Sequence, residues 1–171
     1  MASSKIIKTV TPRTPQHPKT RWEVMDNFKN EINDQIDMIR RMIDKEMSSY
    51  TDRIEMIRNA EFSPNLMSGM WTGMGDMQDL AGGLSVWLKI ACYHKYTIEQ
   101  RNGEWSGFEQ LLDILEREVL GDAISDKYRS ESSSNQFSNA IANSQGLGRG
   151  RGYEDVLSLI RRTRRSLAKA V

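Results

Sequence analysis

WEVMDNFKNEINDQIDMIRRMIDKEMSSYTDRIEMIRNA, residues 22–60, is the stretch that decides the fold. Its apolar side chains recur in steps of three and four residues, with charged side chains between them. This spacing is typical of an amphipathic helix. From Met25 to Met47 the steps form an 11-residue repeat, which favours nearly straight or slightly right-handed pairing with a partner helix. The stripe comprises Met25, Phe28, Ile32, Ile36, Ile39, Ile43, Met47, Tyr50, Ile54 and Ile57.

The length of this helix is open between two alternatives. A continuous helix would rise about 58 Å, whereas a compact domain of this chain length is roughly 40 Å across. Such a helix would overhang its own domain and require another helix beside it, as in a coiled coil. A break at residues 48–51 would instead give a helical hairpin, with Ser49 capping the second helix. At the start, Thr20 and Glu23 have the T-x-x-E spacing of a capping box.

Residues 61–83 combine methionine with glycine. The apolar spacing is helical, but glycine weakens helices, so we expect a short, loosely formed helix or a hinge. Methionine side chains adapt to varied surfaces, so this face is a candidate protein-interaction site as well as a candidate for ordinary burial. The candidate residues are Met67, Met70, Trp71, Met74 and Met77.

Two further helices are expected to complete the core. Residues 84–98 are apolar nearly all round and predict a central buried helix, in which Cys92 is a small core residue and His94 is structural. Ser106 and Glu109 form another capping-box pattern. The apolar side chains expected to point inward from the helix that follows are Phe108, Leu111, Leu112, Leu115 and Val119.

The fold class predicted from these patterns is all-α, with a long N-terminal amphipathic helix or helical hairpin packed against a small helical core. Residues 1–20 contain three spaced prolines and predict a basic flexible arm. Residues 21–129 form the expected acidic helical domain. Residues 130–152 are rich in Ser, Asn, Gln and Gly and predict a linker, and residues 153–171 predict an Arg-rich terminal helix.

Opposite charges are segregated along the chain, although the formal net charge is only +1. Residues 1–21 carry a net charge of +5, residues 149–171 carry +5, and residues 22–148 carry −9. The basic ends could bind an external polyanion such as RNA, the acidic body of a neighbouring copy, or the acidic body of their own chain.

The C-terminal arginines are the strongest chemical signal. The run Gly148-Arg149-Gly150-Arg151-Gly152 resembles the arginine–glycine segments of RNA-binding proteins, and guanidinium groups bind phosphates in a forked geometry. Arginine-rich helices also bind acidic protein surfaces. The candidate nucleic-acid-binding residues are Arg149, Arg151, Arg161, Arg162, Arg164, Arg165 and Lys169, helped by Lys5, Lys8 and Arg13.

Catalytic and cofactor-binding motifs are missing from the sequence. It has no phosphate-binding loop, no dinucleotide fingerprint, no nucleophile elbow and no zinc-protease motif, so we expect no enzyme, no cofactor and no metal site. No apolar stretch approaches the roughly 18 residues that span a membrane. A lone cysteine and the absence of an apolar leader favour a reducing compartment, cytoplasmic or nuclear.

Two short segments, Met74-Gly75-Asp76 and residues 100–105, resemble pieces of the influenza nuclear export protein family, which adapts viral ribonucleoprotein to other proteins. The resemblance covers only these residues, with a different spacing between the pieces, and assigns no family. The sequence thus predicts a self-associating, non-enzymatic protein that binds RNA or ribonucleoprotein, in the manner of a small viral structural or accessory protein in an infected cell or virion. The alternative is an adaptor or matrix-like assembly protein whose basic tails dock on acidic protein surfaces.

Overall fold

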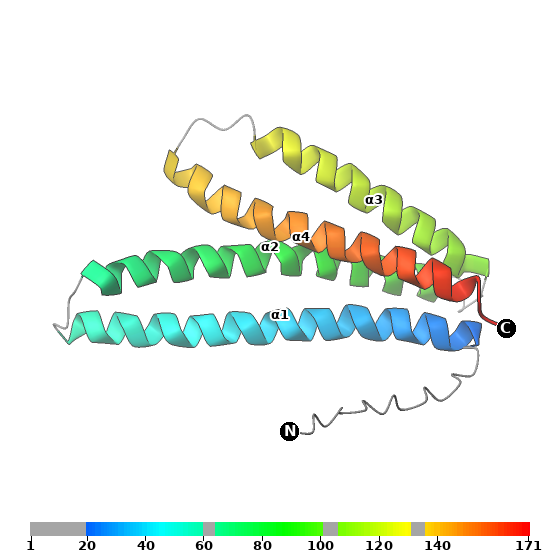
Figure 1. Cartoon of the computed structure of the whole chain (residues 1–171), viewed down its shortest axis with the longest axis horizontal. Coiled ribbons are helices and arrows are strands. Elements are labelled where there is room, and N and C mark those ends of the chain that lie inside the picture. Colours follow the sequence, from blue (N-terminus) through cyan, green and yellow to red (C-terminus); the bar gives the residue numbers. More distant parts are fainter. Residues whose placement is uncertain (1–19, 60–63, 101–105, 131–135) are drawn as a thin grey trace, which may run out of the picture.

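The computed structural model describes residues 20–59, 64–100, 106–130 and 136–171. These residues form four helices, as Figure 1 shows: α1 (Arg21–Arg58), α2 (Pro64–Gln100), α3 (Ser106–Ser130) and α4 (Gln136–Leu167). Helices α1 and α2 run antiparallel as a long hairpin, α4 lies across α2, and α3 packs on the outer side of α4. The predicted all-α class, with a long N-terminal helix against a small helical core, is confirmed.

Helix α1 is continuous, so the alternative with a break at residues 48–51 is wrong. At its start, the Thr20 amide donates to Glu23 Oε2 over 2.7 Å, and the Glu23 amide donates to Thr20 Oγ1 over 3.2 Å. The predicted capping box is therefore confirmed. Further along, the Thr51 hydroxyl donates to the Met47 carbonyl oxygen over 3.0 Å. This hydroxyl bonds back to its own helix, and the backbone continues helically through the serines.

The hydrophobic core lies where all four helices meet. Phe28 of α1 packs edge-on against Phe108 of α3, with ring centroids 5.5 Å apart. All five α3 side chains predicted to point inward are buried. Helix α4 contributes a buried face made of Tyr153, Val156, Leu159, Ile160, Thr163 and Leu167.

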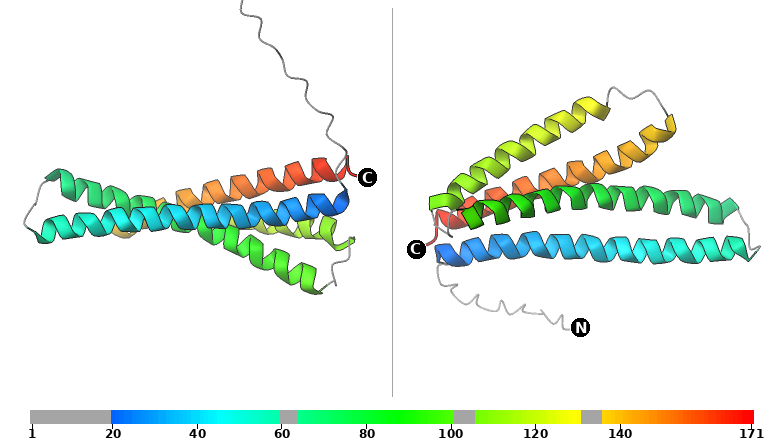
Figure 2. Two further views of the ribbon diagram at one scale, coloured as in Figure 1. Left: turned by 90° about the horizontal axis from the view of Figure 1, so that it is seen from below. Right: turned by 180° about the vertical axis from the view of Figure 1, so that it is seen from behind.

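The apolar stripe of α1 is buried along only part of its length. From Met25 to Ile39 its side chains are buried, whereas Met47 is 52% exposed and Ile54 is 43% exposed. Figures 1 and 2 show that the tip of the α1–α2 hairpin extends beyond α3 and α4. The stripe therefore lies in the core where other helices cover it and reaches solvent where they do not.

Helix α2 runs unbroken through the described residues 64–83, so the short, loosely formed helix or hinge predicted there is wrong. Two of its glycines lie against an arginine of α1. Arg53 Nη1 donates to the Gly69 carbonyl oxygen over 2.5 Å, and a Cβ added at Gly73 would lie 3.2 Å from the same Nη1 atom. The missing side chains make room for the guanidinium group between the two helices.

Helices α2 and α4 touch through their backbones at a crossing of glycines. A Cβ added at Gly82 would overlap the Gln145 carbonyl oxygen, and a Cβ added at Gly148 would overlap the Asp79 carbonyl oxygen. One turn further along α4, a Cβ at Gly152 would come within 3.1 Å of Val86 Cβ. Only glycine allows such an approach, because any side chain would separate the two helices.

This crossing corrects the expectation of a linker. Residues 136–152 are helical and belong to α4, which continues without a break into the Arg-rich segment. A glycine weakens a helix by about 1 kcal/mol relative to alanine when nothing else acts on it. In α4, close packing against α2 offsets that cost. Cys92 is a second correction, because it is exposed rather than buried in the core.

We predict opposite effects for two neighbouring glycine substitutions. Gly148→Ala should lower the free energy of unfolding by about 1–3 kcal/mol or more, because its Cβ collides with the α2 backbone. Gly150→Ala should raise it by about 0.5–1 kcal/mol, because nothing lies within 4 Å of the added Cβ and alanine favours the helix. Urea denaturation measures both values. Equal effects from the two substitutions would contradict the crossing.

Candidate functional site

Three of the candidate arginines bind carboxylates of their own chain. Arg151 pairs with Asp79 of α2, and Arg162 pairs with Glu31 of α1. Arg164 reaches two carboxylates of α3: its Nη2 lies 2.6 Å from Asp113 Oδ1 and its Nη1 lies 2.5 Å from Glu116 Oε2. Helix α4 is thus tied electrostatically to each of the other three helices.

These ion pairs reduce the number of arginines in residues 149–165 that are open to a phosphate ligand. A phosphate that bound Arg151, Arg162 or Arg164 would first have to replace a carboxylate that already accepts from the guanidinium group. The pair between Arg164 and its two acids uses both ends of the fork, the geometry in which arginine binds anions best. The structure therefore does not present the six arginines as one open phosphate-binding track.

Three basic residues remain exposed at the end of α4. Arg161 and Arg165 lie one turn apart, and Lys169 lies in the turn that follows the helix. Among the described residues, none of the three forms an ion pair; the Arg165 Nε atom donates to the Arg161 carbonyl oxygen over 3.4 Å. We call these three residues the basic stripe. Figure 1 shows that the C-terminal end of α4, which carries it, lies at the end of the bundle where α1 begins. The other candidates, Lys5, Lys8 and Arg13, lie outside the described residues.

A pocket lies between α1, α2 and α4, close to the glycine crossing, with a volume of about 370 Å³. Its apolar surface comes from Met38, Met42, Leu80 and Trp87. Gly148 and Gly152 lie in its wall, so the close contact of α2 and α4 shapes it. We call this pocket the methionine groove. Met38 is 43% exposed and Met42 is 46% exposed, so apolar surface is open to solvent here.

The methionine groove has an acidic rim. Four carboxylates line it, and its single cationic side chain, Arg151, pairs with one of them, Asp79. The other three form no ion pair with any described residue. Their even spread over α1, α2 and α4 favours a cationic ligand with an apolar side. These three carboxylates belong to Glu46, Asp76 and Asp155.

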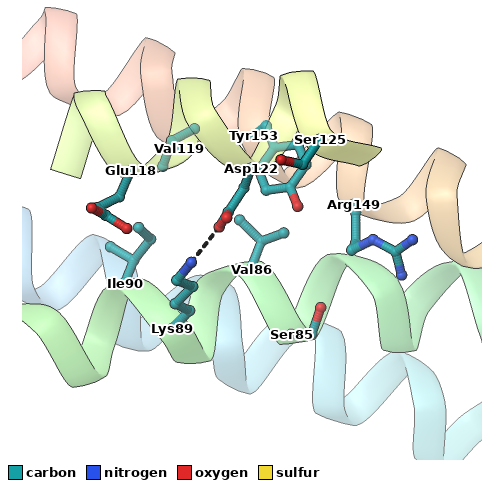
Figure 3. Close-up of a pocket in the computed structure, with 10 residues that line it drawn as sticks. All are labelled: Ser85, Val86, Lys89, Ile90, Glu118, Val119, Asp122, Ser125, Arg149 and Tyr153. Atoms are coloured by element: carbon teal, nitrogen blue, oxygen red, sulfur yellow. Dashed lines mark hydrogen bonds and ion pairs between the residues drawn. The ribbon is translucent and has the colours of Figure 1, made fainter. Parts of the chain in front are cut away.

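A second pocket, of about 330 Å³, lies between α2, α3 and α4 and is shown in Figure 3. Lys89 of α2 points to Asp122 of α3 and pairs with it. The hydrogen bond that Lys89 Nζ donates to Asp122 raises the pKa of Lys89, so this lysine stays charged. Arg149 and Glu118 also line the pocket, and Arg149 makes a further contact within the molecule. Two cations face two carboxylates here, so the pocket has no excess charge for an ionic ligand.

The protein-interaction residues predicted on α2 are only partly described. Met74 and Met77 are half-buried, and the side chains of Met67, Met70 and Trp71 lie outside the described residues. The exposed methionines of the described chain lie instead on α1, at Met38, Met42, Met47 and Met56. Met47 belongs to the predicted stripe, whereas sequence reasoning missed Met38, Met42 and Met56 because they stand beside it. The sequence feature that could have revealed them is that the apolar face of α1 is wider than its main stripe.

Metal-binding and membrane-spanning features are not found in the described residues. No group of three His, Cys, Asp or Glu side chains among them could hold a metal ion. None of the four helices contains, in its described part, an apolar stretch suited to crossing a bilayer. Comparison of the chain with protein-family models, curated proteins and solved structures gives no match.

His94 gives the bundle a predicted acid sensitivity. Burial lowers the pKa of His94 below its ordinary value of 6.5, and the positive charge of Lys29 lowers it further. Its ring packs near Phe28, with centroids 5.9 Å apart. As the pH falls through about 6.5, the unfolded chain takes up this proton before the folded chain does. The free energy of unfolding should therefore decrease between pH 7.5 and 5.5.

A pair of substitutions tests this acid sensitivity. His94→Gln should flatten the decrease measured by urea denaturation at several pH values. His17→Gln, which removes the other histidine of the chain, should leave it unchanged. A decrease of the same size in the His94→Gln variant would show that other groups cause it.

We predict that Arg164 stabilises the bundle more than Arg165 does. Arg164→Ala should lower the free energy of unfolding by about 1 kcal/mol, a modest value because the pairs with Asp113 and Glu116 are partly exposed to water. Arg165→Ala removes the same charge from the same helix and should change it by less than about 0.5 kcal/mol. Urea midpoints provide the comparison, and the difference should shrink at high salt. Equal losses in the free energy of unfolding from both variants would mean that the ion pairs of Arg164 add no stability beyond that of a positive charge on this part of α4.

Proposed function

We propose that this protein is a non-enzymatic helical adaptor that binds a basic, partly apolar protein segment in the methionine groove. The observation that carries the proposal is the combination of exposed methionine side chains with three carboxylates, on three different helices, that pair with no described residue. An apolar patch with a polar rim is a common property of protein-binding surfaces. The acidic rim selects the charge of the partner, and the apolar floor contributes the buried area.

The long α1–α2 hairpin supports the same proposal. A stretch of α1 projects past the core with Met47, Ile54 and Met56 exposed, so apolar surface continues from the groove toward the tip. By contrast, three of the arginines on which the polyanion hypothesis depends form ion pairs within the chain. The balance of the two observations favours a protein partner over a nucleic acid. Self-association remains a prediction of the sequence, since one adaptor surface can also bind a second copy.

A substitution in the groove, with a matched control, tests the adaptor proposal. A fluorescent peptide of about 15 residues with alternating lysine and leucine faces serves as the probe. Met42→Lys should weaken its binding by about tenfold or more, because it removes apolar contact and adds a like charge. Met56→Lys makes the same change at a similarly exposed position outside the groove, and it should have little effect. Equal weakening by the two variants would contradict the proposal.

A second candidate function, binding of RNA, is favoured by the basic stripe. Arg161, Arg165 and Lys169 are exposed in the last turns of the chain, at the end of the bundle where α1 begins, and the basic residues 1–19 precede α1 in the sequence. Single-stranded RNA would contact such a site through its phosphates, and binding would weaken steeply with salt. Truncating α4 is not a suitable test, because α4 supplies Val156 and Ile160 to the core.

Paired charge substitutions test this second candidate. Arg161→Ala with Arg165→Ala should lower the RNA affinity and reduce the slope of log K against log salt by about 1–2. Arg41→Ala with Lys45→Ala removes two exposed cations at the same spacing on α1 and should leave the slope unchanged. Identical losses in both double variants would indicate that RNA senses only the overall charge.

A further inference from the structure

We propose that the methionine groove binds the N-terminal arm of its own chain, through the segment Lys5-Ile6-Ile7-Lys8-Thr9-Val10. This inference rests on the proposed function, because it identifies the basic, partly apolar segment that the groove accepts. The arm matches the groove in composition and in charge, and it is long enough to reach the groove.

Charge and composition match between the arm and the groove. The groove has an excess of three negative charges once the pair between Arg151 and Asp79 is set aside. Residues 1–19 contain four cations and no acid, and two of the lysines flank Ile6 and Ile7. The isoleucines would bury against methionine side chains, whose unbranched chains adapt to different apolar shapes. The lysines would lie among the rim carboxylates, where their charge is complementary.

The length of the arm matches the position of the groove. Along α1, the groove methionines Met38 and Met42 lie about 27–33 Å from Thr20, at 1.5 Å per residue. Ten residues in the extended conformation that proline favours span about 31 Å, which would bring Val10 from Thr20 to the level of these methionines. Three prolines lie between Val10 and Thr20, so this part of the arm is suited to be a spacer. Lys5 would then reach as far as Glu46 at the outer end of the groove.

Binding within one chain is favoured over exchange between two chains. A segment tethered by a short spacer has an effective local concentration in the millimolar range, above the concentration of free chains in most solutions. Weak contacts therefore suffice to hold the arm in its own groove. A partner that binds the groove would have to displace the arm, and the arm would then be released at the end of the bundle that carries the basic stripe.

Engineered disulfides in the full-length chain test this arrangement. Cys92 is exposed, so it is first replaced by Cys92→Ser, and Ile7→Cys is combined either with Met42→Cys in the groove or with Asp44→Cys outside it. Met42 and Asp44 are both exposed, and they lie about 200° apart around α1. Both lie about 33–36 Å from Thr20 along α1, within the reach of the 13 residues back to Ile7 at about 3.3–3.6 Å each, so the length of the arm alone does not favour either pair.

We expect the pair of Ile7→Cys and Met42→Cys to form an intramolecular disulfide at least about tenfold faster than the pair with Asp44→Cys, at a rate independent of protein concentration. Lys5→Glu with Lys8→Glu should abolish this advantage. Equal rates for the two pairs would overturn the proposal. Disulfide-linked dimers whose rate rises with concentration would overturn binding within one chain and indicate arm exchange between copies.

A peptide experiment separates failure of this inference from failure of the adaptor proposal. A labelled peptide of residues 3–15 is added to the full-length Lys5→Glu, Lys8→Glu variant, in which the arm no longer competes. If this peptide binds and Met42→Lys weakens it while the disulfide rates are equal, the groove is a binding site that its own arm does not occupy. If the peptide does not bind and the rates are equal, both proposals fall.

Discussion

The backbone contact between Gly82 of α2 and Gln145 of α4, together with that between Gly148 and Asp79, is the constraint on which the rest of the structure depends. Helix axes in contact are usually 8–10 Å apart because side chains separate them, and glycine removes that separation. The close approach fixes where α4 crosses the hairpin. It thereby sets which carboxylates the α4 arginines can reach and places Gly148 and Gly152 in the wall of the methionine groove.

Acidic and basic residues that are far apart along the chain form ion pairs with one another in the folded structure. The acidic block of the sequence supplies Glu31, Asp79, Asp113 and Glu116, and the basic C-terminal segment supplies the arginines that pair with them. Partly exposed pairs of this kind add little stability one by one. Their larger effect is on specificity, because a shifted α4 would separate its arginines from these carboxylates. Among the described charges without an ion pair are those of the acidic groove rim and of the basic stripe, which lie on different parts of the surface.

The spacing of apolar residues predicted much of this fold. The intrinsic helix propensity of glycine gave wrong predictions where glycines occur. The stripe of α1, the capping box at Thr20 and the inward face of α3 were predicted from spacing, which reports burial directly. The glycines near residues 69–83 and 146–152 predicted a hinge and a linker, because intrinsic propensity treats glycine as a helix breaker. Their contacts with Arg53 and between α2 and α4 are tertiary, and no single segment contains them. The ion pairs of the arginines are tertiary contacts too. The sequence therefore identified the arginines as cations but could not show which carboxylates they pair with.

Figure 1 shows that the start of α1 and Val171 lie at the same end of the bundle, whereas the last turn of α1 and the first turn of α2 lie at the other. A protein attached after Val171 would therefore hold this molecule by its base and leave the hairpin pointing away. Helix α1, with 38 residues, would act as a rigid spacer of about 57 Å between whatever holds the base and whatever contacts the tip. For anyone placing affinity tags or fluorophores, the end after Val171 leaves the far half of the hairpin clear.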